Sequence, residues 1–154
     1  MSKKDAMAVS KIKNGTVIDR IPPGKALKVV DLLGLDKEGH TLTIGMFMSS
    51  TKMKLKDIVK VHDRTLTKTE IDALGLFAPG VTISTIENYD VRTKIEPKVP
   101  EIIEEVLKCN NPTCATNYRE PVITKFRVIQ VNPLLVRCYY CDRVMLEENI
   151  MSQF

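Results

Sequence analysis

Residues 16–23 read T-V-I-D-R-I-P-P, and this short stretch decides the architecture of the first half of the chain. Its β-branched residues favour a strand, which cannot continue through two prolines. Apolar residues then recur with helical spacing over residues 26–33, and Gly34 can end that helix in a left-handed conformation. The chain therefore begins with a strand followed at once by a short helix that has one buried face.

The elements that follow complete a recognisable order. A second helix begins at Thr67, which forms a capping-box pattern with Glu70. The remaining extended stretches lie at residues 40–48, 53–62, 81–86 and 89–95. The first two are joined by a polar turn at residues 49–52, and the last two by a turn centred on Asn88. The order β-α-β-β-α-β, with one strand added, predicts an α+β fold of the ferredoxin-like type, in which two helices cover one face of an antiparallel sheet.

A domain boundary is expected at residues 95–100, which read I-E-P-K-V-P. Two prolines three residues apart remove backbone donors and disfavour helix before each of them. All four cysteines lie after this segment. We therefore expect a first domain over residues 1–96 and a small β-rich domain over residues 101–154.

The cysteines form the most specific motif of the chain: Cys109, Cys114, Cys138 and Cys141. Their spacing is C-x4-C, then 23 residues, then C-x2-C, and two such knuckles can bring four thiolates tetrahedrally around one Zn²⁺ ion. Two disulfides are a competing interpretation, but a reducing compartment disfavours them. A redox pair formed by Cys138 and Cys141 is another, but it would leave Cys109 and Cys114 without a role. A domain of about fifty residues is often stabilised by a metal, so we expect one structural zinc ion.

Composition sets limits on function. The 154 residues are 44% hydrophobic and carry a formal charge of +4, and no stretch reaches the roughly 20 apolar residues that span a bilayer. The polar N-terminus has no signal-peptide core, so we expect a cytoplasmic protein without membrane contact. Six cations and two carboxylates lie between residues 52 and 68, which suits either an anionic ligand or a solvated strand edge.

An enzyme is not expected. His40 and His62 both fall in predicted strands, far in sequence from the cysteines, and offer no catalytic triad. No phosphate-binding loop, dinucleotide fingerprint or nucleophile elbow occurs in the sequence. A zinc-ribbon protein that binds nucleic acid is the alternative, but the second half begins and ends with glutamates, so no nucleic-acid partner is expected.

Several stretches of the sequence resemble one known family. Residues 12–22 read I-K-N-G-T-V-I-D-R-I-P and are similar to the opening strand of aspartate carbamoyltransferase regulatory chains. The similarity continues through residues 43–45, 56–61, 78–79, 88–91 and 138–141. It implies a regulatory, non-catalytic subunit of pyrimidine biosynthesis, with an allosteric nucleotide-binding domain and a zinc domain that contacts the catalytic chain. It also implies a homodimer with a second regulatory chain.

The resemblance also implies particular residues. Effectors such as CTP and ATP would use the backbone near Ile12, Tyr89 and Val91 for the base, Asp19 for the ribose and Lys60 and Lys94 near base, sugar or phosphates, with Val17 and Ile86 lining the site. The catalytic chain would contact the loops that carry Asn111, Thr113, Asp142 and Arg143. Two positions depart from the family pattern: Arg20 replaces a usual His, and Ser84 a frequent Asn.

Overall fold

The computed structural model describes residues 11–118 and 122–154. The chain separates into two units, Met1–Pro97 and Lys98–Phe154, and each is described by itself. The N-terminal stretch in which the sequence predicts no signal peptide lies mostly outside the described residues. Among the described residues, no helix is long and apolar enough to cross a membrane.

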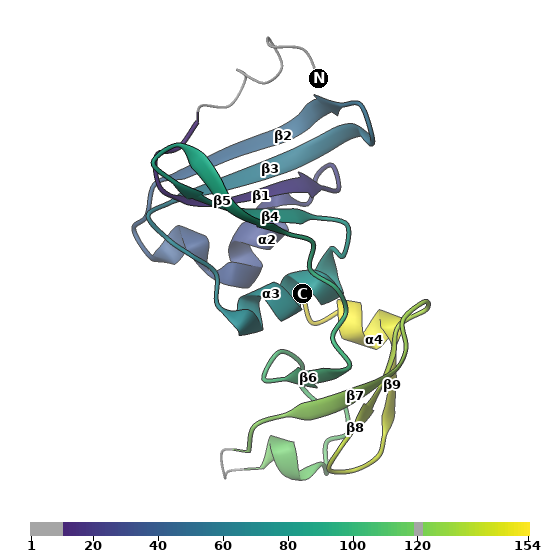
Figure 1. Cartoon of the computed structure of the whole chain (residues 1–154). Coiled ribbons are helices and arrows are strands. Elements are labelled where there is room, and N and C mark those ends of the chain that lie inside the picture. The colour runs from purple at the N-terminus through teal and green to yellow at the C-terminus, as the bar shows by residue number, and fades with distance from the viewer. Residues whose placement is uncertain (1–10, 119–121) are drawn as a thin grey trace. The chain divides into compact units, whose positions relative to one another are not determined.

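Among the described residues, the first unit is an antiparallel five-stranded sheet with two α-helices on one face (Figure 1). The strands are β1 (Gly15–Ile21), β2 (Leu42–Ser50), β3 (Lys54–His62), β4 (Thr82–Glu87) and β5 (Asp90–Ile95), in the spatial order β2-β3-β1-β4-β5. The helices are α2 (Ala26–Leu33) and α3 (Lys68–Phe77), and the 3₁₀ turn η1 (Leu35–Lys37) follows α2. The predicted ferredoxin-like arrangement is confirmed, with β5 as the strand added to one edge.

The two faces of this sheet differ in what they carry. Side chains alternate between faces along a strand. Ile18, Val59 and Ile83 therefore share the face on which α2 packs through Val29 and Leu33, and all five belong to one buried cluster. The alternate residues of the same strands lie on the opposite face, which is called the outer face below.

Helix α2 is capped by a residue from a distant strand. Within the described residues, Lys25 at its N-cap position makes no side-chain cap bond. Instead, the fully buried carboxylate of Asp57, on β3, accepts hydrogen bonds from the backbone N–H groups of Gly24 at 2.9 Å, Ala26 at 3.0 Å and Phe47 at 2.9 Å. Phe47 has a positive φ of 56° at an irregularity of β2. One carboxylate thus joins a helix start to a strand irregularity.

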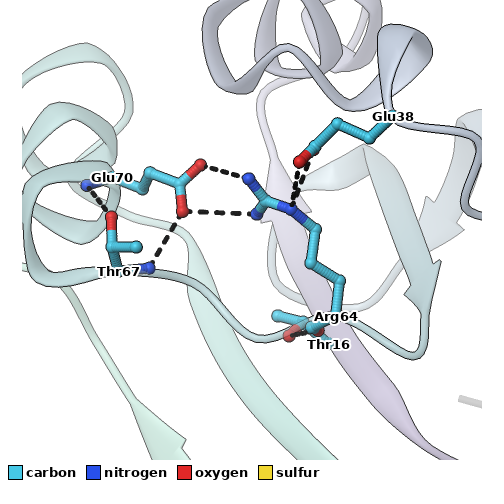
Figure 2. Close-up of polar contacts among 5 residues, drawn as sticks. All are labelled: Thr16, Glu38, Arg64, Thr67 and Glu70. Atoms are coloured by element: carbon cyan, nitrogen blue, oxygen red, sulfur yellow. Dashed lines mark hydrogen bonds and ion pairs between the residues drawn. The ribbon is translucent and has the colours of Figure 1, made fainter.

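Helix α3 begins with the predicted capping box. The Thr67 side chain accepts the Glu70 N–H, and the Glu70 carboxylate accepts the Thr67 N–H. The same carboxylate binds the guanidinium of Arg64, with Nη2 at 2.6 Å, and Arg64 Nε lies 2.8 Å from Glu38 (Figure 2). The hydroxyl of Thr16 donates to the Arg64 backbone carbonyl at 2.6 Å. Arg64 therefore joins β1, the start of α3 and the turn after α2.

Several element boundaries differ from those predicted. Strand β2 includes Ser49 and Ser50, which were expected in the turn, and pairs there with β3 through Ser50 opposite Lys54. His40 precedes β2, so its predicted place within a strand is wrong, whereas His62 is the last residue of β3. The turn between β4 and β5 contains Asn88 and Tyr89, both with positive φ, as a two-residue hairpin turn of type I′ requires.

The second unit is a smaller antiparallel sheet in the order β6-β7-β8-β9. Its strands are β6 (Ile102–Glu104), β7 (Lys125–Gln130), β8 (Leu135–Cys138) and β9 (Val144–Leu146), with the 3₁₀ turn η2 (Ala115–Asn117) and the C-terminal helix α4 (Glu147–Met151). Ile103, Phe126, Val136, Met145 and Ile150 are fully buried within it. The predicted small β-rich cysteine domain is confirmed.

Candidate functional site

The four cysteine sulfurs converge on one point in the second unit. All four Sγ atoms lie within 4.8 Å of one another. Cys109 lies 3.6 Å from Cys141, and Cys114 lies 3.6 Å from Cys138. Both distances far exceed the roughly 2.05 Å of a disulfide bond. They are close to the roughly 3.8 Å between thiolates bound tetrahedrally at about 2.3 Å from one metal ion, so the donor set fits a metal centre.

Local structure holds the ligands in place. Cys138 ends β8, and its sulfur accepts a hydrogen bond from the Tyr140 N–H at 3.4 Å. Cys114 lies directly before η2, and its sulfur accepts from the Thr116 hydroxyl at 3.2 Å. The Asn117 amide donates to the carbonyl of Cys109 at 3.0 Å. Each knuckle is therefore fixed by hydrogen bonds, as metal-binding loops commonly are.

The thiols differ in acidity before a cation binds. Burial raises the pKa of Cys109 to about 12, against an opposing effect of the Asn111 N–H. Burial likewise raises the pKa of Cys138. For Cys141 the effect of burial is outweighed by the Arg143 N–H and the Asn111 side chain, and the pKa falls to about 7. Because a divalent cation favours thiolates, its binding would displace protons from the buried cysteines.

The loops beside the metal centre carry the residues expected to contact a partner. The Asn111 carboxamide oxygen accepts hydrogen bonds from the N–H of Thr113 at 3.1 Å and its hydroxyl at 2.9 Å, so this loop is held in one conformation. Asp142 has a positive φ of 60° and lines a pocket of about 260 Å³ together with Arg127, Arg137, Cys138 and Tyr139. The pocket thus opens next to the second knuckle.

A row of cross-strand neighbours crosses the outer face of the first unit. Lys60 of β3 is paired with Val17 of β1, Val17 with Ser84 of β4, and Ser84 with Lys94 of β5. Residues paired in this way lie side by side on one face of a sheet. Two lysines therefore stand on either side of a centre formed by Val17 and Ser84. Strand β5 does not neighbour β1 directly, because β4 lies between them.

Asp19 follows Val17 on the same face, and its carboxylate contacts one ammonium group and one backbone N–H group. The Lys56 ammonium is 2.9 Å away, and the Arg20 N–H donates to the carboxylate at 2.7 Å. The pKa of Lys60 is lowered below 10.5, chiefly by burial, while Asp19 raises it and Lys11 and Lys56 lower it further. Positive charge is therefore concentrated on this face, at a partly desolvated position.

The other expected ligand residues lie toward the turn between β4 and β5. Ile86 is paired with Val91 across the hairpin and with Gly15 on β1. The Tyr89 N–H donates to the carbonyl of Lys13 at 2.9 Å, which brings the turn against the segment that contains Ile12. Ile12 is buried, whereas the side chains of Tyr89 and Val91 are 61% and 58% exposed. Apolar surface is thus available beside the charged row, toward the turn between β4 and β5.

Three outer-face residues were not identified as ligand candidates from the sequence: Lys56, Thr82 and Ser84. Thr82 is paired with Asp19, and its buried hydroxyl has no hydrogen-bond partner among the described residues. An unpartnered buried hydroxyl is uncommon and can be satisfied by a polar ligand. Alternation along β3 places Lys56 on the same face as Lys60, whereas Thr82 and Ser84 are identified only when the pairing of β1 with β4 is known.

Comparisons with known proteins agree over almost the whole chain. Residues 7–98 match the family described as the aspartate carbamoyltransferase regulatory chain, allosteric domain, and residues 101–151 match its metal binding domain. The chain is 51% identical over 148 residues to an aspartate carbamoyltransferase regulatory chain of Pyrococcus horikoshii, covering 95% of this chain and 97% of the relative. It is 43% identical to the regulatory chain of Thermoplasma volcanium, over 97% of this chain and 99% of the relative. It is 40% identical to the regulatory chain of Methanothermobacter thermautotrophicus, over 100% of this chain and 99% of the relative.

Proposed function

This chain belongs to the family of aspartate carbamoyltransferase regulatory chains, and from that premise we propose that it binds nucleoside triphosphates and controls a catalytic chain allosterically. It is a regulatory chain and not a catalytic one. The proposed output is control of pyrimidine biosynthesis, and the proposed effectors are nucleotides such as CTP and ATP.

The observation that carries the proposal is the row formed by Lys60, Val17, Ser84 and Lys94. Lysines suit a triphosphate because each ammonium is a compact charge with several donors. We assign Lys60 and Lys94 to the phosphates and the adjoining sugar, and Asp19 to the ribose hydroxyls. A ribose hydroxyl could donate to the Asp19 carboxylate beside the ion pair of this carboxylate with Lys56.

The base would bind toward the hairpin end of the same face. We propose that backbone groups near Ile12, Tyr89 and Val91 form its hydrogen bonds, and that Val17 and Ile86 provide apolar contacts. A rigid antiparallel sheet suits this task because its backbone donors and acceptors are already fixed before the ligand arrives.

Calorimetric titration with CTP and with ATP tests the nucleotide site. Lys60→Ala and Lys94→Ala should each weaken binding about ten-fold to a hundred-fold, because a hydrogen bond to a charged group contributes roughly 1.5–3 kcal/mol. Lys68→Ala is the matched control, since Lys68 lies on α3 and its side chain is 87% exposed beside Asp72. Equal losses in all three variants would mean diffuse charge attraction, and unchanged affinity at Lys60 and Lys94 would refute the assignment.

We propose that the ion of the second unit is Zn²⁺ and that it is structural, because four thiolates leave no open coordination position. Cysteine ligands persist in a reducing compartment, so the proposal includes a cytoplasmic location. Elemental analysis should find one zinc per chain. Cys138→Ser should unfold the second unit while the helical signal of the first unit is retained, and a metal-free wild-type protein would refute the proposal.

The proposed partners are the catalytic chain of aspartate carbamoyltransferase and a second copy of this chain. The loops with Asn111, Thr113, Asp142 and Arg143 are proposed to contact the catalytic chain, because loops held by a metal and by hydrogen bonds lose little entropy on docking. Co-purification with the catalytic chain should be lost in Arg143→Glu and retained in Arg92→Glu, which changes an exposed residue of β5. A monomeric mass at micromolar concentration would contradict the homodimer.

A further inference from the structure

The side chain of Gln153 pairs with the backbone beside the first cysteine. The Gln153 carboxamide oxygen accepts the Lys108 N–H at 2.8 Å, and its nitrogen donates to the Lys108 carbonyl at 2.8 Å. One side chain therefore satisfies both backbone groups of a residue 45 positions earlier, in the manner of a neighbouring strand. Lys108 directly precedes Cys109, one of the four metal ligands.

The end of the chain is held in a defined position for this pairing. Helix α4 is anchored by Ile150, which is fully buried. Beyond the helix, the N–H groups of Gln153 and Phe154 donate to the carbonyls of Ile150 and Met151 at 3.2 and 3.1 Å, and the Ser152 N–H donates to Glu148 at 3.1 Å. The terminal residues are thus tied back to α4, so presenting the Gln153 carboxamide requires little further ordering.

Contacts on the other side of Cys109 complete a clamp. The side-chain amide of Asn117 donates to the carbonyls of both Cys109 and Asn111, at 3.0 and 2.7 Å. The backbone of Cys109 is therefore fixed from its N-terminal side by Gln153 and from its C-terminal side by Asn117. Without the Gln153 side chain, the N–H and carbonyl groups of Lys108 would bind water in place of the carboxamide. The N-terminal side of Cys109 would then no longer be held.

We propose that Gln153 is a positioning residue for the metal centre, which holds Cys109 on the ion and slows metal release. The inference rests on the proposed metal site. Zinc content of the wild-type chain tests that site first, so failure of the site and failure of the clamp are distinguishable. Opening of the C-terminal end would be the first step of metal loss, with Cys109 the first ligand to leave.

The test measures zinc release from the full-length, zinc-loaded chain into an excess of the chelating dye 4-(2-pyridylazo)resorcinol. Gln153→Ala should release zinc about ten-fold faster, a change that corresponds to about 1.4 kcal/mol and suits two solvent-exposed hydrogen bonds. Gln153→Glu keeps an acceptor for the Lys108 N–H but places an oxygen against its carbonyl, so it should not restore the wild-type rate. Gln130→Ala is the control, because Gln130 makes one exposed hydrogen bond to the carbonyl of Pro133 in the same unit.

A second readout separates positioning from general loss of stability. The zinc-loaded variants are treated with N-ethylmaleimide, and the modified cysteines are identified by mass spectrometry. Positioning predicts that, among the three buried cysteines, Cys109 is modified before Cys114 and Cys138 in Gln153→Ala, with no change of order in Gln130→Ala. Parallel modification of all four cysteines, or release rates equal to wild type, would overturn the proposal.

Discussion

The ammonium nitrogen of Lys56 lies 2.9 Å from one carboxylate oxygen of Asp19 and 3.1 Å from the other. The Lys56 side chain is 10% exposed and that of Asp19 is 32% exposed, so the pair is only partly screened by water. This relationship joins β1 and β3, which carry Asp19 and Lys60 of the proposed nucleotide site. It leads to the first prediction.

Asp19→Asn should lower the free energy of unfolding by roughly 2 kcal/mol, because it leaves a largely buried ammonium without its counter-ion. The loss should stay below that of a fully buried pair, since Asp19 is partly exposed. Urea unfolding at neutral pH measures it. Asp90→Asn, at an exposed position of β5, should change stability by no more than about 0.5 kcal/mol. Similar losses in both variants would argue against the pair.

Nucleotide binding should be linked to proton uptake at alkaline pH. The pKa of Lys60 is lowered below 10.5, chiefly by burial. A bound triphosphate would favour the ammonium and raise that pKa, so the protein should take up protons on binding, and affinity should fall as pH rises through the lowered pKa. Calorimetry at about pH 9, in buffers with different ionisation enthalpies, measures the uptake.

The control for this linkage is Lys60→Arg, which keeps the positive charge but cannot lose its proton in this pH range. It should bind nucleotide without the proton uptake. Unchanged uptake in Lys60→Arg would assign the titration to another group and would contradict the role given to Lys60.

Asp57→Ala should destabilise the first unit by about 3 kcal/mol or more. The substitution leaves three backbone N–H groups, of Gly24, Ala26 and Phe47, without their acceptor, and one of them belongs to the start of α2. Asp57→Asn retains one acceptor oxygen and should lose less. Thermal unfolding followed by circular dichroism measures the loss. The unfolding temperature should be highest in the wild type, lower in Asp57→Asn and lowest in Asp57→Ala.

Acid stability should depend on Arg64. Burial raises the pKa of Glu70, but hydrogen bonds from Arg64 and Thr67 outweigh this effect, and the pKa is lowered below 4.5. A carboxylate with a lowered folded-state pKa contributes stability that is present above its unfolded pKa and is lost as pH falls through the folded one. Arg64→Met should therefore reduce stability at pH 7 by about 1–2 kcal/mol and weaken its dependence on pH below about 4.5.

Lys68→Met provides the comparison for Arg64. Lys68 forms an exposed pair with Asp72 one helical turn away, and such pairs contribute only about 0.3–0.5 kcal/mol. Urea unfolding between pH 3 and 7 distinguishes the two variants. If both showed the same small effect, the contacts of Arg64 in Figure 2 would have no energetic importance.

The sequence was sufficient for features that depend on local spacing. The capping box of Thr67 and Glu70, the hairpin turn at Asn88 and the left-handed Gly34 each involve residues within one turn of chain, where steric and hydrogen-bonding rules apply directly. The four cysteines were predictable for a related reason, because two short knuckles leave few ways to arrange four thiols.

Features that depend on strand pairing were not predictable in this way. Asp57 caps a helix that begins 31 residues earlier, and Arg64 binds Glu38 from a different loop. Thr82 and Ser84 join the outer face only because β4 pairs with β1, and β1 and β2 each contain an irregularity that shifts the register. Such long-range pairings are set by the packing of the whole sheet and not by neighbouring residues.

Strand β1 lies at the centre of the first sheet, paired with β3 on one side and with β4 on the other. Strand β1 precedes the other described strands in the sequence, and neither of its partners exists until about forty more residues have been made. The last residue of the charged row, Lys94, follows on β5. Because loop closure must precede such distant pairing, we expect β1 to stay unpaired until the β2–β3 and β4–β5 hairpins form on either side of it. A nascent or truncated chain would therefore hold only fragments of the proposed nucleotide site, so that responsiveness to nucleotides would arise only after the whole first unit has been synthesised and folded.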